Sequence, residues 1–454
     1  MATQFLLLLF SLFLLLASIQ TTLGESPASP TTASPAKASV SLAEELPPFQ
    51  PTASIRSLFY NARLMQAYFV IQRFKRTVTA DPFNVTKTWR GPDICRRNDT
   101  TKYLGFYCDY LPGSRPGDPN ALTVAAVDFN TFHIAAPTAA VIIQNLPDLA
   151  FFHANSNKFG GNLAVDFTKL PYFYELDVSN NIVATPFPTS VFNIPSTTFL
   201  DLRFNSFSGR IPPRLFASFN QIEVIFLNNN GFDQPIPANL GRSRVRYLTF
   251  ANNRFNGSIP RSIRLANQTL TEVLFLNNLL SGCIPYEIGF LNHTTVFDVS
   301  RNRLTGPLPL SIRCMESMQQ LSFAHNLLYG QIPEVVCQLP MLEAFSLANN
   351  YFTSVGPICR SLINRGVLDV SNNCILGRTD QRPPAECNAF YGGRLACANP
   401  PNARIIPCTP TTSSTTSAAA DEAALAPSSS SSEADLAPAP SPSRTYAALS
   451  QHRG

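Results

Sequence analysis

Hydrophobic residues recur along the chain with a fixed period between about residues 121 and 374. Within each unit apolar and polar residues alternate, which predicts a short β-strand, and an Asn follows in the pattern L-x-x-L-x-L-x-x-N. A degenerate unit, Val124 to Ala136, precedes ten clear units, so we count about eleven. The ten Asn residues lie 23 to 25 positions apart, at Asn157, Asn181, Asn205, Asn230, Asn253, Asn278, Asn302, Asn326, Asn350 and Asn373. This period predicts a solenoid whose stacked units bury one another's apolar faces.

Three further features indicate how each unit folds. We expect the Asn to turn inward, where its amide can satisfy backbone groups of a tight turn. A second apolar residue, two positions later, should stack on the outer side, as at Phe159, Phe207, Phe232, Phe255, Leu280, Leu304, Leu328 and Phe352. A G-x-I-P-like turn follows in five units, where Gly allows the bend and Pro presets φ. The pattern resembles leucine-rich repeats of the plant extracellular type and predicts an α/β solenoid shaped as a horseshoe.

Composition divides the chain into six predicted segments: a signal peptide (1–24), a disordered Pro/Ser/Ala-rich arm (25–54), an N-terminal cap (55–120), the leucine-rich repeats (121–374), a Cys-rich C-terminal cap (375–408) and a disordered Ala/Ser/Pro-rich tail (409–454). The signal peptide is predicted from the uncharged run Phe5 to Ala17, which is too short to span a bilayer. Apolar spacing from Ile55 to Arg76 predicts a helix in the N-terminal cap. We therefore expect a secreted protein without a membrane anchor.

Cysteines and glycosylation sequons agree with an oxidising, extracellular location. Cys95 and Cys108 are the pair that we expect most strongly, and Cys314 is a candidate partner for Cys283. The sequence leaves the connectivity of the other cysteines open. Those predicted to form disulfides are Cys337, Cys359, Cys374, Cys387, Cys397 and Cys408, and the five sequons lie at Asn84, Asn98, Asn256, Asn267 and Asn292.

Charge and motif content argue against several classes of function. Only 14% of the residues are charged and the net charge is +5, which excludes a polybasic nucleic-acid binder. The five His residues stand in no nucleophile elbow, zinc-binding spacing or phosphate-binding loop. His153 and His325 fall within strand segments, where we interpret them as surface or contact residues. We therefore predict that the protein is not an enzyme and that it has no cofactor and no metal site.

The x positions of each repeat are expected to face the concave side of the horseshoe. Over ten repeats they carry eight acids and three bases, so this face should be net negative although the whole chain is positive. One interpretation is that Asp177, Asp201, Asp298 and Asp369 are repeat consensus; the other is that acids and aromatics together bind a basic peptide. The predicted peptide-binding residues are Phe151, Tyr174, Glu175, Asp177, Phe199, Asp201, Phe204, Glu223, Phe226, Tyr247, Glu272 and Leu274.

Several sequence blocks resemble the plant leucine-rich repeat extensins over about residues 60 to 408. The similarity is carried by the cap stretch "AYFVIQRFKRTVTADPFNVTKTWRGPDIC", the repeats "FLDLRFNSFSGRIP" and "VFDVSRNRLTGPLP", and the tail cap "NCILGRTDQR…EC". The family's long Ser-Pro-Pro-Pro-Pro region is missing, and the tail has only Ala-Pro and Ser-Pro dipeptides. Attachment to the wall through this tail is therefore not expected.

The resemblance implies a secreted protein of the plant cell wall that binds a small basic peptide of the rapid alkalinisation factor type, in wall integrity or growth control. One alternative is a defence protein similar to polygalacturonase inhibitors, which share this repeat type. Another is a structural glycoprotein that contacts wall polysaccharide. Another secreted protein or a second copy of the chain, forming a homodimer, are further alternatives as partners.

Overall fold

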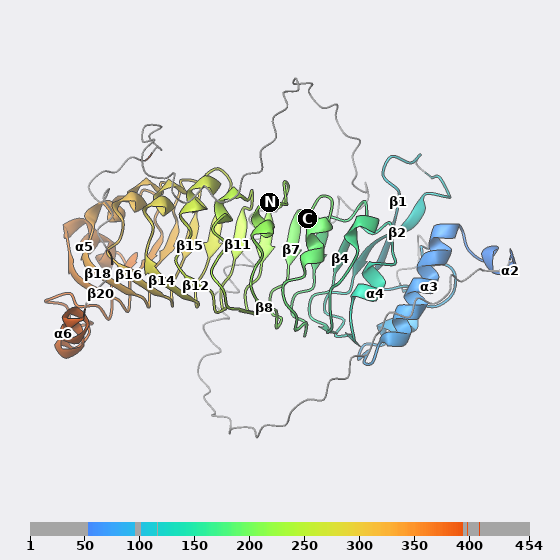
Figure 1. Ribbon diagram of the computed structural model, residues 1–454, viewed down its shortest axis with the longest axis horizontal. Helices are drawn as coiled ribbons and strands as arrows, with labels where there is room; N and C mark the ends of the chain where they lie inside the picture. Colours follow the sequence, from blue (N-terminus) through green and yellow to red (C-terminus); the bar gives the residue numbers. More distant parts are fainter. Residues whose placement is uncertain (1–52, 96–100, 116, 394–396, 398–407, 409–454) are drawn as a thin grey trace, which may run out of the picture.

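The computed structural model describes residues 53–95, 101–115, 117–393, 397 and 408. The predicted signal peptide, most of the N-terminal arm and the tail lie outside these residues. The described chain forms an elongated curved solenoid with a helical cap at the blue end and a small helix at the red end (Figure 1). In the part of the chain that is described, no helix has the length and hydropathy needed to cross a bilayer.

A twelve-stranded sheet lines one side of the solenoid from end to end. Its first strand, β1, pairs antiparallel with β2, and every later neighbour pairs parallel. The eleven strands after β1 match the eleven units counted in the sequence. In order, the strands are β1 (Phe106–Tyr110), β2 (Leu122–Asp128), β4 (Phe151–His153), β6 (Glu175–Asp177), β7 (Phe199–Asp201), β9 (Val224–Phe226), β11 (Tyr247–Thr249), β13 (Glu272–Leu274), β15 (Val296–Asp298), β17 (Gln320–Ser322), β19 (Ala344–Ser346) and β21 (Leu368–Asp369).

Short strands on the outer side form three separate groups. They are the pair β3 (Ala135–Ala136) and β5 (Lys158–Phe159), the pair β8 (Ser208–Gly209) and β10 (Gly231–Phe232), and a five-stranded sheet of β12 (Asn256–Gly257), β14 (Leu279–Cys283), β16 (Arg303–Gly306), β18 (Leu327–Ile332) and β20 (Tyr351–Val355). The five-stranded sheet falls entirely in the C-terminal half of the repeats. The outer side is therefore more regular in that half.

Short helices return the chain from the outer strands to the next inner strand. They are α4 (Ala140–Ile143), η2 (Phe167–Lys169), η3 (Thr189–Asn193), η4 (Pro213–Phe216), η5 (Leu240–Arg242), η6 (Arg261–Ala266), η7 (Tyr286–Phe290), η8 (Leu310–Cys314), η9 (Glu334–Gln338) and α5 (Pro357–Asn364). In the five G-x-I-P-like turns the Gly has a φ between 70° and 92°, and the Pro directly precedes a 3₁₀ helix. The turn therefore works as the sequence predicts, because only Gly adopts this φ without strain.

The repeated Asn residues are inside the solenoid and hold the turns together. The Asn302 amide donates to the carbonyls of Phe275, Val299 and Ser300 at 3.0–3.1 Å, and its oxygen accepts from the Leu280 amide at 2.9 Å. All ten Asn residues make this type of contact to the preceding unit and to their own turn. They satisfy buried backbone groups that no strand partner reaches.

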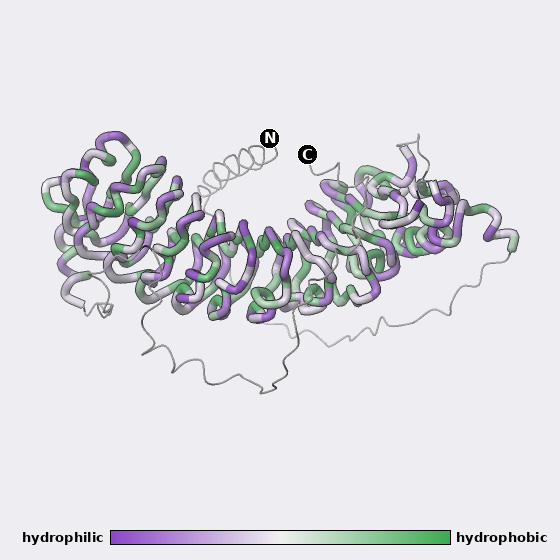
Figure 2. Tube along the Cα trace, turned by 90° about the horizontal axis from the view of Figure 1, so that it is seen from above, coloured by the Kyte–Doolittle hydropathy of each residue, from purple (hydrophilic) through white to green (hydrophobic). Residues whose placement is uncertain are grey.

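The second apolar residue of each unit forms a buried spine beneath the outer strands. In the middle repeats this spine is aromatic: Phe207 stacks on Phe232 and Phe232 on Phe255, with ring centroids 6.4 and 6.0 Å apart. All three side chains are fully buried. Figure 2 shows hydrophobic and hydrophilic segments alternating along every coil of the curved solenoid. One core therefore runs continuously from unit to unit.

The N-terminal cap contains two helices where the sequence predicts one. α2 (Ala53–Arg56) ends before Asn61, which caps α3 (Ala62–Thr77) by accepting from the Leu64 amide at 2.8 Å. The Asn61 side chain also donates to the carbonyls of Pro119 and Leu122. An Asn at this position favours a helix start over a helix interior, which explains the break.

Aromatic packing joins the cap to the first repeats. η1 (Val85–Thr88) precedes Trp89, which is fully buried, stacks on Phe129 and donates its indole N–H to the Leu104 carbonyl. Outside the aromatic contacts, Arg63 of α3 forms an ion pair with Asp148 at 2.7 Å. The cap therefore covers the open end of the core, as a solenoid requires.

Five disulfides connect the ten cysteines. The bond between Cys95 and Cys108 is the one that the sequence led us to expect. The proposed pairing of Cys283 with Cys314 is wrong, since these residues bond instead to Cys397 and Cys408 respectively. The partners are 114 and 94 residues away, so repeat register gives no signal for them. The remaining bonds are Cys337–Cys359 and Cys374–Cys387.

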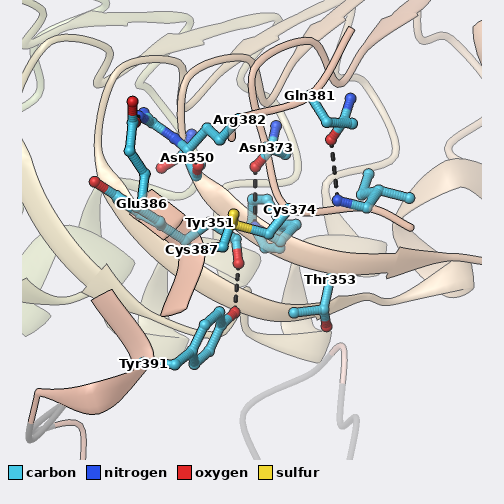
Figure 3. The surroundings of a disulfide bond; sticks show 12 residues. Asn350, Tyr351, Thr353, Asn373, Cys374, Gln381, Arg382, Glu386, Cys387 and Tyr391 are labelled. Carbon is cyan, nitrogen blue, oxygen red and sulfur yellow. Dashed lines mark hydrogen bonds and ion pairs between the residues drawn. A yellow bond between two sulfur atoms is a disulfide. The ribbon is translucent and has the colours of Figure 1, made fainter. Parts of the chain in front are cut away.

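The C-terminal cap packs on the last repeats around the second of these bonds (Figure 3). Beside it, Arg382 donates to the Asn350 carbonyl at 2.9 Å and lies over the ring of Tyr351. From α6 (Pro384–Gly392), Phe390 stacks on Tyr351 at 3.6 Å between ring centroids, and the Tyr391 hydroxyl donates to the Tyr351 carbonyl. These contacts cover the C-terminal end of the repeat stack.

Candidate functional site

Aromatic side chains lie side by side on the inner sheet in the N-terminal half of the repeats. Phe151 stacks on His153 with centroids 4.6 Å apart, and His153 lies 6.3 Å from Phe199. Phe199 in turn meets Phe226 edge to face at 6.0 Å. The guanidinium of Arg203 covers the Phe226 ring at 5.0 Å. We call these five residues, which come from or follow β4, β7 and β9, the aromatic patch.

A His–Glu pair adds charge to the aromatic patch. His153 Nε2 lies 3.2 Å from a Glu175 carboxylate oxygen, on the neighbouring strand β6. Burial disfavours the charged imidazolium, but the Glu175 carboxylate and the nearby Asp177 and Asp128 outweigh it and raise the pKa of His153. From the sequence, His153 is interpreted as a surface or contact residue; its partner Glu175 depends on the parallel register of β4 and β6.

The Asp residues at the centre of the repeats have a structural role. Asp177, Asp201, Asp298 and Asp369 each accept a hydrogen bond from the backbone amide two residues later, at 2.8–3.0 Å. Asx contacts of this kind hold a turn. This geometry supports the repeat-consensus interpretation of these four acids and leaves less of their charge for a ligand.

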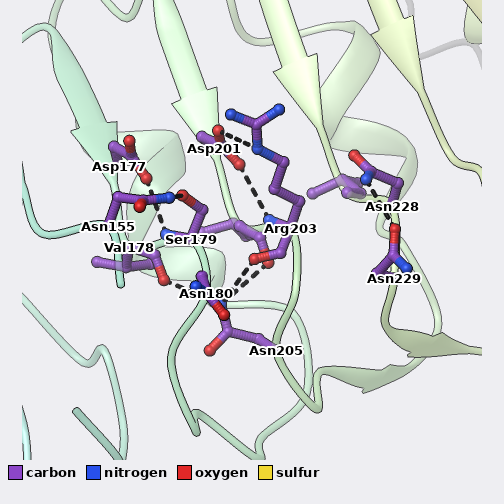
Figure 4. Close-up of polar contacts among 12 residues, drawn as sticks. Asn155, Asp177, Val178, Ser179, Asn180, Asp201, Arg203, Asn205, Asn228 and Asn229 are labelled. Carbon is purple, nitrogen blue, oxygen red and sulfur yellow. Dashed lines mark hydrogen bonds and ion pairs between the residues drawn. The ribbon is translucent and has the colours of Figure 1, made fainter. Parts of the chain in front are cut away.

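Asp201 is the extreme case, because its side chain is fully buried. One carboxylate oxygen accepts from the Arg203 amide, and the other lies 2.9 Å from Arg203 Nε (Figure 4). Complete burial and the nearby Asp177 raise the pKa of Asp201 well above its usual range, against the opposing influence of Arg203. Asp201 therefore orients the guanidinium of the aromatic patch instead of facing a ligand.

The twelve residues predicted to bind peptide fall into two groups. Those with exposed or half-buried side chains are Phe151, Glu175, Asp177, Phe199, Phe204, Glu223 and Tyr247. Those that are at most 8% exposed are Tyr174, Asp201, Phe226, Glu272 and Leu274. The expectation of an open surface is wrong for the second group. Parallel strands are about 4.8 Å apart, so large side chains in register cover one another.

Phe204 is unusual among the positions that directly precede the repeated Asn. All ten of these positions have a φ between 51° and 60°, and six of them are Asn, which tolerates this left-handed conformation. Phe204 has a φ of 51° and is 38% exposed. A bulky residue with positive φ is rare and costs conformational energy. A strained, exposed aromatic beside the aromatic patch is therefore a candidate contact residue.

A groove of about 790 Å³ adjoins the aromatic patch where β9, β11 and β13 begin. It is lined by polar residues, including Thr198, Glu223, Arg244, Arg246, Gln268 and His293. Glu223 is among the residues predicted from the sequence to bind peptide, whereas Arg244, Arg246 and His293 are not. The two Arg residues flank buried Val245, and the structure brings both side chains to the groove.

The five glycosylation sequons differ in their surroundings. Asn84 and Asn292 are exposed, and Asn267 is half-buried beside Gln268 of the groove. Asn256 donates its side-chain amide to the Asp233 carbonyl at 2.6 Å, so the nitrogen that would carry a glycan is engaged. Asn98 lies outside the described residues. Glycosylation at these sites stays a prediction.

Inner sheet, Asn-stabilised turns and disulfide-bonded caps together define a leucine-rich repeat domain of the plant extracellular type. A similar solved structure is the complex of the Arabidopsis receptor kinase HAESA with the peptide hormone IDA and the co-receptor SERK1. It is 26% identical, with a TM-score of 0.57 over 68% of this chain and 50% of that chain. A plant ice-binding protein, 19% identical with a TM-score of 0.53 over 71% and 98% of the two chains, shares the fold.

Sequence relatives narrow the class to a family. Leucine-rich repeat extensin-like protein 6 of Arabidopsis thaliana is 39% identical over 340 residues, which cover 75% of this chain and 69% of the relative. Extensin-like protein 2 is 39% identical over 75% of this chain, and protein 1 is 38% identical over 76%. The chain belongs to the leucine-rich repeat extensin-like family. It spans 42% and 44% of the length of proteins 2 and 1, and no protein-family model matches it.

Proposed function

We propose that this chain is a secreted protein of the plant cell wall whose concave face binds a small basic peptide of the rapid alkalinisation factor type. The observation that carries the proposal is the aromatic patch, with Phe151 and Phe199 flanking the His153–Glu175 pair. Aromatic side chains provide contact area at low entropic cost, and carboxylates steer a basic partner. Glu175 is half-buried and Glu223 is exposed, so both carboxylates are accessible to such a partner.

Two further observations support the proposal. The HAESA structure, which shares this fold at 26% identity, contains a peptide hormone. Five disulfides and membership of the extensin-like family fit an extracellular location. Such binding would serve wall integrity or growth control.

The test is calorimetric titration of the secreted full chain with a synthetic peptide of the rapid alkalinisation factor type. We expect a Kd of micromolar or tighter that weakens with salt, and a loss of about tenfold or more in Phe199→Ala. Gln320→Ala is the matched control, because Gln320 opens β17 as Phe199 opens β7. Absence of binding at every salt concentration would contradict the proposal, and inhibition of a fungal polygalacturonase would favour the defence alternative.

A further inference from the structure

The groove at the start of β9, β11 and β13 carries a net positive charge, because two Arg residues and one Glu line it. Arg244 and Arg246 flank buried Val245, and both side chains line the groove. Both Arg side chains are exposed, and His293, from two units further along, lines the same groove. Within the described part of the chain, no carboxylate lies in ion-pair distance of either Arg, although Glu223 lines the same groove.

Two backbone amides beneath the groove are already engaged within the sheet. The Arg246 amide donates to the Glu223 carbonyl at 2.8 Å, and the Thr271 amide donates to the Arg246 carbonyl at 2.8 Å. The side chains that line the groove include two guanidinium groups, with Gln268 and His293. A guanidinium group suits a carboxylate, because one Arg can donate two parallel hydrogen bonds to its two oxygens. A second Arg adds further donors and positive charge.

The groove is continuous with the aromatic patch. Thr198, Glu223 and Arg246 directly precede Phe199, Val224 and Tyr247, the first residues of three adjacent inner strands. The carboxylates of Glu175 and Asp177 lie on β6, between the patch strands β4 and β7. A ligand that runs from the patch into the groove thus meets the carboxylates on β6 first and the two Arg side chains after them.

We propose that this groove binds the C-terminal carboxylate of the peptide ligand through Arg244 and Arg246. The inference rests on the proposed function and adds to it the orientation of the peptide. The basic body of the peptide lies over the patch near Glu175, and its C-terminus enters the groove. Capture of a peptide carboxylate by a fixed cluster of donors is a general recognition mode.

The experiment compares two synthetic peptides of identical sequence, one with a free C-terminal acid and one with a C-terminal amide. Each is titrated against the secreted full chain, made in plant cells because Asn267 and Asn292 border the groove. We expect the amide to bind about tenfold more weakly to the wild type, since it lacks the charge-assisted hydrogen bonds. In Arg244→Gln/Arg246→Gln the two peptides should bind equally.

The matched control is Arg254→Gln/Arg264→Gln, which removes the same charge from exposed positions outside the groove. It should keep the difference between acid and amide. Equal binding of both peptides to the wild type would overturn the inference but leave the proposed function standing, whereas no binding of either would overturn the proposed function. Binding of an oligo-uronate that Arg244→Gln/Arg246→Gln abolishes, with the peptide insensitive to amidation, would assign the groove to an acidic sugar instead.

Discussion

The two halves of the repeat stack share one inner sheet but differ on the outside and in their chemistry. In the C-terminal half the outer strands form a five-stranded sheet, and four of the five disulfides have both ends in that half or its cap. In the N-terminal half the outer strands form only isolated pairs, among the described residues. The aromatic patch and strained Phe204 lie in that half, and the positive groove begins there.

The two halves differ in how closely their repeats follow the consensus pattern. Repeats close to the consensus stack regularly and form the scaffold. Arg301 and His325 also stand where other units have Asn, but Phe204, in the N-terminal half, is the position at which a hydrophobic ring is exposed. Two Arg residues also face the groove that adjoins this half. Local departures that cost stability are expected at functional sites. Under the proposed function, the N-terminal half binds the peptide and the C-terminal half, with its more regular outer sheet, serves as the scaffold.

Replacing one of the ten repeated Asn residues should cost the most stability, and it should cost about the same in both halves because these residues make the same type of contact in every unit. Asn302→Ala leaves the Leu280 amide and carbonyls such as that of Phe275 without this partner. At about 1–3 kcal/mol for each buried group, the free energy of unfolding should fall by about 3 kcal/mol or more. Asn181→Ala, which removes the same contacts in the N-terminal half, should cost about as much in urea denaturation. A much smaller loss there would show that the inner sheet is not uniform.

A disulfide of the C-terminal half gives the next largest effect. Replacing Cys337 and Cys359 by Ala opens a bond that spans 22 residues and should cost about 3 kcal/mol. Hydrogen exchange should rise in β18, β20 and α5, while the aromatic patch keeps its protection and peptide affinity. A loss of peptide affinity of the same size as the loss of stability would contradict the division between the halves.

Phe204→Asn tests whether the exposed ring at this strained backbone position contacts the peptide. Asn adopts positive φ more readily, so the free energy of unfolding should increase by about 1 kcal/mol. Peptide affinity should fall severalfold in the same calorimetric titration, because the exposed ring is lost. The reference is His325→Asn, which makes the same kind of change in the C-terminal half and should leave affinity unchanged. A variant that gains stability without losing affinity would remove Phe204 from the site.

The smallest effect concerns the pH dependence of stability. Because the pKa of the Asp201 carboxyl is raised in the fold, its stabilising contribution is present at low pH and is lost as pH rises through that value. Asp201→Asn keeps an oxygen that can accept from the Arg203 amide and removes the buried charge. Relative to wild type, its free energy of unfolding should increase between about pH 4 and pH 7. If the difference in free energy of unfolding between the variant and the wild type did not change over this range, Arg203 would fully compensate the charge of Asp201.

The sequence predicts the repeated features of this molecule better than its individual ones. The repeated Asn residues, the G-x-I-P-like turns and the eleven inner strands each follow from a local pattern that recurs. Every unit therefore shows the same sequence signal again. The bonds of Cys283 and Cys314, by contrast, depend on where the distant cap returns. The burial of Tyr174 and Phe226 depends on neighbouring strands, and no single repeat contains that information.

The most direct test of the division is a hydrogen-exchange footprint of the bound peptide on the secreted full chain. Binding at the aromatic patch and groove predicts that the peptide slows exchange in and around β4, β6, β7, β9 and β11, with β17, β19 and β21 unchanged. Protection confined to β17, β19 and β21 would contradict the account, because it would place the peptide on the C-terminal half of the inner sheet.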